Sequence, residues 1–94
     1  MALARVATFE DVDAARIAEL KASIEGGERP DDLPATEVII LHDPAASRSL
    51  SIVFFANEED YRKGDAALNA MPAEGTPGKR TSLTKYDVGV RATA

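Results

Sequence analysis

Two apolar runs near the middle of the chain constrain its fold more than any other feature. Residues 38–41 and 52–56 place large apolar side chains at consecutive positions. The segment between them contains Asp43 and Pro44, which favour a turn because proline fixes φ and aspartate bonds to the backbone just beyond it. So short a connection predicts an antiparallel hairpin. Its two strands are expected over residues 36–42 and 49–56.

A helix is expected after a first strand over residues 3–9. Asp11 or Asp13 is the expected N-cap, because a carboxylate there accepts a hydrogen bond from a free N–H group of the first turn. Apolar residues at intervals of three and four form one stripe along this helix: Ile17, Leu20 and Ile24, with Val12 a turn earlier. The helix is expected to end at about Glu25. Glycines follow it, at Gly26 and Gly27, and favour the left-handed conformation of helix ends.

A second helix is expected after Asn57. Asparagine is a good N-cap, and the acidic residues behind it complement the positive end of a helix dipole: Glu58, Glu59 and Asp60. The buried stripe of this helix is expected to hold Tyr61, Leu68 and Met71. Gly64 costs about 1 kcal/mol of helix propensity relative to alanine. It is therefore expected to mark close packing or a kink.

A final strand is expected over residues 80–91, where Tyr86, Val88 and Val90 alternate with polar residues. Loops are expected over 28–34 and 72–78. The element order is then β-α-β-β-α-β, which predicts an α+β fold, a ferredoxin-like sandwich. Such a sandwich has a four-stranded antiparallel sheet with both helices on one face. The 94 residues provide material for a single domain, 1–94.

Two helices cover only one face of such a sheet. In the two apolar strands, large side chains point to both faces, because neighbours along a strand alternate. Leaving one set exposed creates an apolar patch of several hundred Å², which monomeric proteins avoid. A homodimer in which two sheets pack face to face is therefore expected. The alternative is that one strand is central and its neighbours carry the polar groups.

Composition excludes several classes of function. Sixteen acidic and eleven basic residues give a net charge of −5, which argues against a nucleic-acid partner. Cysteine is absent, so disulfides, thiolate metal sites and thiol catalysis are excluded. With one histidine, no metal site and no cofactor are expected. No segment resembles a signal peptide or approaches the roughly 20 apolar residues of a membrane span, so a cytoplasmic protein without membrane partners is expected.

The chain resembles the dimeric α+β barrel superfamily, and within it the antibiotic-biosynthesis-monooxygenase-like (ABM-like) proteins. The resemblance covers residues 3–91 and rests on element order, length, the Phe9-Glu10-Asp11 exit from the first strand and the strand-to-helix passage over 52–60. It implies a homodimer that binds or transforms a small apolar or aromatic molecule between the second helix and the sheet. Members include cofactor-independent monooxygenases of polycyclic aromatics, haem-degrading enzymes and isomerases of small lactones.

The catalytic residues of these relatives do not carry over. Haem-degrading members use an asparagine of the first strand, a tryptophan of the third and a histidine of the second helix. The corresponding places in this chain hold other residues: Thr8 and Phe9, Phe54 and Phe55, and Tyr61. The aromatic-oxidising members also rely on tryptophan, which this chain lacks. No catalytic residue is predicted, and whether the protein is an enzyme stays open.

Five residues are candidates for ligand binding: Tyr61, Arg5, Phe54, Phe55 and His42. The Tyr61 hydroxyl could orient a polar group of a ligand, or the ring could fill the core with its hydroxyl at the surface. Arg5, unusual in an apolar strand, could hold an anion or pair with a carboxylate across the dimer. His42 could act as a general base with Asp43, or be a solvated residue of the hairpin.

Two further functions stay open beside ligand binding. A non-catalytic dimeric module would use its apolar residues for folding and association alone. An anion-binding regulator would use Arg5, Lys79 and Arg80.

Overall fold

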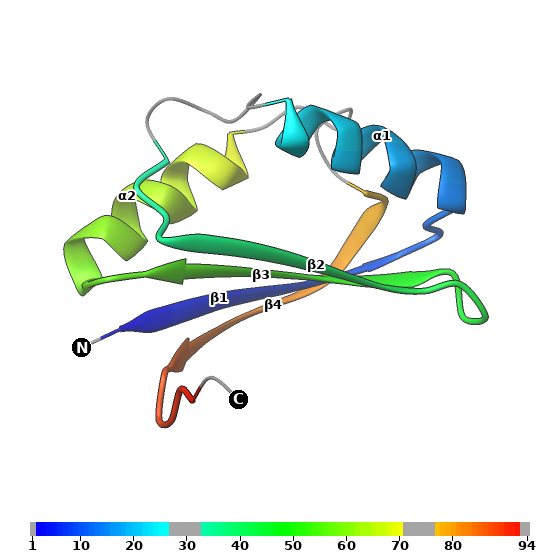
Figure 1. The fold of residues 1–94 in the computed structure, drawn as a ribbon. Coiled ribbons are helices and arrows are strands. Elements are labelled where there is room, and N and C mark those ends of the chain that lie inside the picture. The colour runs from blue at the N-terminus through cyan, green and yellow to red at the C-terminus, as the bar shows by residue number, and fades with distance from the viewer. Residues whose placement is uncertain (1, 27–32, 71–76, 93–94) are drawn as a thin grey trace.

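The computed structural model of the protein describes residues 2–26, 33–70 and 77–92, apart from the side chain of Ile24. One sheet carries both helices on the same face (Figure 1). The elements, in chain order, are β1 (Leu3–Glu10), α1 (Ala14–Glu25), β2 (Glu37–Asp43), β3 (Arg48–Phe55), α2 (Glu58–Asn69) and β4 (Lys79–Asp87). This is the predicted ferredoxin-like fold. Gly27, Met71 and residues 28–32 and 72–76 of the two predicted loops lie outside the described residues.

The sheet has the strand order β2-β3-β1-β4, with every neighbouring pair antiparallel. The predicted hairpin joins β2 to β3, and its register pairs Ile39 with Ile52. β1 is central, and pairs Arg5 with Val53 on one side and with Lys85 on the other. Since paired residues point to the same face, this register fixes which side chains lie under the helices and which lie on the opposite face.

The core lies between the helices and the sheet, in two clusters. The first contains Leu3, Val53, Phe55 and Tyr61, with Leu68 of α2 packed against it. The second contains Ala7, Phe9 and Val12, with Ile17 of α1 packed against it. The predicted helix stripes are therefore confirmed for Val12, Ile17, Tyr61 and Leu68. We call the covered side of the sheet the helix face and the other side the open face.

Both helices begin where the sequence predicts. The Asp13 carboxylate accepts from the Arg16 backbone N–H at 2.7 Å, so Asp13 rather than Asp11 caps α1. The Asn57 amide oxygen accepts from the Asp60 backbone N–H at 2.8 Å, and Asn57 is extended, as an N-cap should be.

Replacing Asn57 by alanine should destabilise the protein by about 1 kcal/mol, because one N–H group of the first turn loses its acceptor. Urea denaturation followed by circular dichroism measures this change. Asn57→Asp is the control, since aspartate is an equally good cap and should retain stability close to that of the parent. Equal losses for both variants would contradict this role of the side chain.

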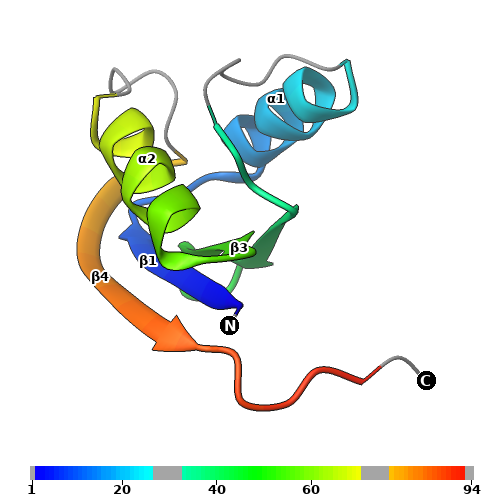
Figure 2. The same ribbon diagram turned by 90° about the vertical axis from the view of Figure 1, so that its left-hand side faces the viewer.

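The final strand is shorter than predicted. β4 ends at Asp87, and residues 88–92 leave it and run beneath the open face (Figure 2). The Val88 N–H still donates to the Ala2 carbonyl at 3.0 Å, but Arg91 lies over the Phe54 ring at 4.9 Å and pairs with Glu37. Phe54 and Glu37 belong to β3 and β2, so these contacts draw the end of the chain across the sheet. The alternation of Val88 and Val90 is therefore not that of a strand.

Candidate functional site

Three of the five candidate ligand-binding residues come together beneath α2. Phe55 of β3 is fully buried and contacts Tyr61 of α2 edge to face, with ring centroids 5.4 Å apart. Arg5 of β1 reaches the same helix and is 4% exposed. Tyr61 is 7% exposed, so its ring belongs to the core rather than to an open pocket wall.

Burial and neighbouring charges together favour the protonated form of the Tyr61 hydroxyl. Burial raises the pKa of Tyr61, and the nearby Asp65 carboxylate raises it further, against the opposing effects of Arg5 and Lys85. The Lys85 ammonium lies 5.0 Å from the centre of the Tyr61 ring and also pairs with Glu58. Because the pKa of Tyr61 is higher in the folded than in the unfolded state, folding favours the protonated phenol. The resulting contribution to the free energy of unfolding is fully present below the unfolded pKa of about 10 and is lost as pH rises through the folded pKa.

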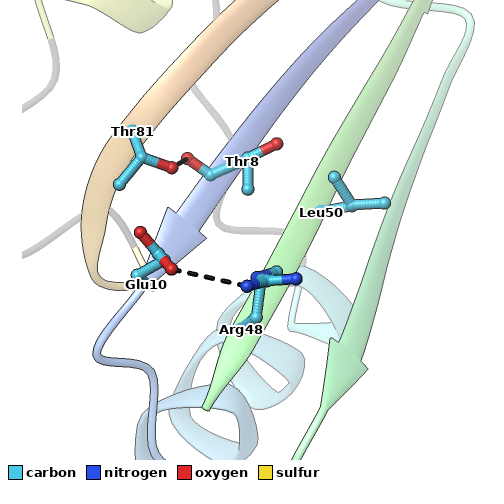
Figure 3. Close-up of a pocket in the computed structure, with 5 residues that line it drawn as sticks. All are labelled: Thr8, Glu10, Arg48, Leu50 and Thr81. Carbon is cyan, nitrogen blue, oxygen red and sulfur yellow. Dashed lines mark hydrogen bonds and ion pairs between the residues drawn. The ribbon is translucent and has the colours of Figure 1, made fainter. Parts of the chain in front are cut away.

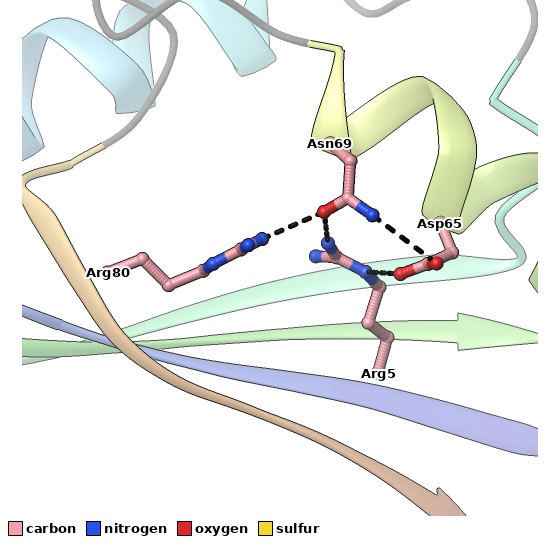
Figure 4. Close-up of polar contacts among 4 residues, drawn as sticks. All are labelled: Arg5, Asp65, Asn69 and Arg80. Carbon is pink, nitrogen blue, oxygen red and sulfur yellow. Dashed lines mark hydrogen bonds and ion pairs between the residues drawn. The ribbon is translucent and has the colours of Figure 1, made fainter.

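Arg5, for which the sequence left open an anion or a carboxylate across a dimer, pairs with a carboxylate of its own chain. Its Nε–H donates to Asp65 Oδ1 at 2.9 Å, and its Nη2–H donates to Asn69 Oδ1 at 3.0 Å (Figure 4). Asp65 and Asn69 are one turn apart on α2, so both face the strand that carries Arg5. A guanidinium of this low exposure is tolerated because a carboxylate and an amide oxygen both receive its hydrogen bonds.

A second arginine joins this group from β4. Arg80 Nη1–H donates to the same Asn69 Oδ1, at 2.9 Å, and the Asn69 amide in turn donates to Asp65 Oδ2 at 3.4 Å. Sequence reasoning missed Asp65 and Asn69. The signal that could have identified them is their i,i+4 spacing on the face of α2 that carries Tyr61, together with a charged residue in an apolar strand.

Phe54 and His42 lie apart from this group. Phe54 points to the open face, because it neighbours Phe55 along β3, and it contacts Arg91. His42 lies opposite Ser49 at the far end of the helix face, half-buried, with Nε2 shielded from solvent and without a hydrogen-bond partner among the described residues. Asp43 points to the opposite face of the sheet, because it neighbours His42 along β2, and its carboxylate accepts from the Ala46 N–H at 3.3 Å.

The open face carries contiguous apolar side chains from three strands. The strand register places Leu41 beside Leu50, then Ile39, Ile52 and Val6 in a row, and then Phe54 beside Ala4 and Tyr86. Most of these residues are half-buried, while Leu41 is 48% and Tyr86 54% exposed. We call the set Val6, Ile39, Leu41, Leu50, Ile52 and Phe54 the apolar patch. On this face β4 contributes Ser82 and Thr84 beside it.

A hollow lies at one end of the open face, with a volume of about 340 Å³. Leu50 and the hydroxyl-bearing Thr8 and Thr81 line it, together with Glu10 and Arg48, whose charged groups lie 3.6 Å apart (Figure 3). The Thr81 hydroxyl donates to the Thr8 carbonyl at 3.4 Å, close to the point where the β1–β4 register shifts. None of the five candidate ligand-binding residues lies here.

Within the described ranges, histidine, aspartate and glutamate side chains form no group of three that could hold a metal ion. Nor is either described helix long and apolar enough to cross a membrane. No protein-family model matches the chain, and no curated protein is similar enough to count as a relative.

Proposed function

We propose that the protein is a homodimeric interaction module of the ABM-like type, whose two sheets pack through their open faces. The apolar patch carries this proposal. Six large apolar side chains lie on a face that neither helix covers. Contiguous apolar surface of this kind, with polar residues around it, is typical of a protein–protein interface.

Charged residues border the apolar patch, as a polar rim surrounds the apolar centre of a protein–protein interface. At one end of the sheet Arg48 pairs with Glu10, and at the other Arg91 pairs with Glu37. Burying a large apolar side chain contributes roughly 1.5–3 kcal/mol, and less where the side chain is already half-buried. Contributions from both copies together reach the roughly 4–15 kcal/mol that association costs in translational and rotational freedom.

The contacts of the candidate residues on the helix face agree with the role of an interaction module rather than an enzyme. Phe55 and Tyr61 pack against each other, and Arg5 is bound to Asp65 and Asn69. In this arrangement these side chains stabilise the fold.

The dimer is tested by introducing a charge into the patch. Wild-type protein should elute with twice the 10.0 kDa chain mass in size-exclusion chromatography with multi-angle light scattering. Ile52→Lys should give a folded monomer, because the interface would bury a charge without a partner. The matched control is Ala66→Lys, which adds the same charge at an exposed position of α2 and should remain a dimer. A monomeric parent at micromolar concentration, or an Ile52→Lys dimer, refutes the proposal.

Binding of a small apolar or aromatic molecule is the second candidate function, and the hollow on the open face favours it. A volume of about 340 Å³ accommodates a small ring system, with Leu50 as an apolar contact and the Thr8 and Thr81 hydroxyls beside it. A thermal-shift screen with aromatic acids, quinones, lactones and haem tests this function, since a ligand bound only by the folded state raises the melting temperature. Leu50→Ala should remove the shift, and no shift with any of these compounds counts against ligand binding.

A further inference from the structure

Two guanidinium groups meet at one amide oxygen beside the last turn of α2. Arg5 approaches Asn69 Oδ1 from the middle of β1, and Arg80 approaches it from the start of β4, with distances of 3.0 and 2.9 Å (Figure 4). An amide oxygen has two lone pairs, so these two hydrogen bonds occupy it fully. Asn69 therefore holds two like charges next to each other and can accept nothing further.

The group contains one carboxylate for two arginines. Asp65 lies 2.9 Å from Arg5 Nε and balances the charge of Arg5. Among the described residues, no carboxylate lies within ion-pair distance of Arg80. The cluster of Arg5, Asp65, Asn69 and Arg80 thus carries one positive charge in excess, and that charge is on its exposed member.

We propose that Arg80, oriented by Asn69 beside Arg5, binds the oxyanion of a small molecule, either a carboxylate or a phosphate group. A guanidinium has five N–H donors in a planar fork that matches two oxygens of such a group. Arg80 uses one nitrogen for Asn69, which leaves the others to donate to the anion. Arg5 lies nearly buried behind it, with its charge balanced by Asp65. This site is independent of the proposed sheet-to-sheet dimer, because it lies on the helix face.

Stabilisation of the helix end is the competing explanation for the two arginines. Asn69 is the last residue of α2, and the negative end of a helix attracts cations. In that case Arg80 would contribute to stability and bind no anion. The two explanations differ in what added anions do to the protein.

The experiment titrates the protein with inorganic phosphate and, separately, with benzoate, at ionic strength held constant with chloride. Binding is followed in NMR spectra through the arginine Nε–H and Asn69 side-chain amide signals. Saturable shifts of these signals are expected for at least one of the two anions. Saturation by phosphate alone assigns a phosphate group to the ligand, and saturation by benzoate alone assigns a carboxylate.

The matched variants are Arg80→Gln and Lys79→Gln, which remove one positive charge from neighbouring exposed positions of β4. Arg80→Gln should weaken binding by about 10-fold or more, as expected for loss of a charged hydrogen-bonding group. Lys79→Gln should change it by less than about twofold, as expected for a screened surface charge. Arg80→Lys keeps the charge but not the planar fork, so its loss of anion affinity should lie between those of Arg80→Gln and Lys79→Gln. Linear, non-saturating shifts, or equal losses for Arg80→Gln and Lys79→Gln, overturn the proposal.

Discussion

Replacing Gly64 by alanine should destabilise the protein by about 3 kcal/mol, although alanine is the better helix former by about 1 kcal/mol. A Cβ atom at this position would lie 2.1 Å from Phe55 Cε1 and 2.3 Å from Phe55 Cζ, far inside van der Waals contact. The Phe55 ring is fully buried and packed against Tyr61, so it has no space into which to move. Overpacking of this kind forces side chains out of their rotamers or displaces the helix.

Chemical denaturation at one fixed protein concentration measures this loss, since association would make the apparent stability depend on concentration. Gly89→Ala is the control, because a Cβ atom there meets nothing within 4 Å. Combining Gly64→Ala with Phe55→Leu should cost less than the sum of the two single changes, because the smaller side chain relieves the clash. A Gly64→Ala variant as stable as the parent would show that α2 does not rest directly on Phe55.

Replacing Arg5 by methionine should cost about 2–3 kcal/mol of folding free energy. The substitution keeps most of the volume of the side chain but leaves the partly buried Asp65 carboxylate with no cation beside it. Removing one partner of a buried ion pair costs about 3–5 kcal/mol. The Asp65 side chain is 34% exposed, so water recovers part of that loss and the smaller value is expected.

Urea denaturation of two further variants tests the origin of this effect. Arg48→Met removes an arginine whose ion pair with Glu10 is half-exposed at both ends, and should cost less than about 1 kcal/mol. Arg5→Met combined with Asp65→Leu should recover much of the lost stability, because no unpaired charge then remains. If the double variant is as unstable as the sum of its single changes, the carboxylate is not the reason that Arg5 matters.

The contrast between Arg5 and Gly64 indicates what can be predicted from sequence. Gly64 was expected to mark close packing or a kink, because glycine in a helix interior needs a reason, and the contact with Phe55 provides one. Arg5 was recognised as unusual in an apolar strand, but the sequence left its partner open between an anion and a carboxylate across a dimer. Asp65 is 60 positions away along the chain, and only the packing of α2 on β1 brings the two together.

The ends of the helices and strands show the same difference between what local sequence predicts and what tertiary contacts decide. The helix caps at Asp13 and Asn57 were predictable, because capping depends on residues within one turn. The end of β4 was not, because the contacts of Arg91 with Phe54 and Glu37 come from other strands. That Phe54 and Phe55 lie on opposite faces of the sheet was predictable, because neighbours along a strand alternate. Which of the two packs beneath α2 was decided by the tertiary structure.

Local pattern alone determined the order of strands and helices, the hairpin and the presence of apolar groups on both sides of it, because periodicity, caps and turns act over a few residues. The tertiary structure decided which side chains meet. It placed Arg5, Asp65, Asn69 and Arg80 in one cluster and aligned the apolar patch across three strands. The physical reason is that hydrogen bonds and ion pairs depend on distances of a few Å between groups far apart in the chain, and strand register and helix packing set those distances.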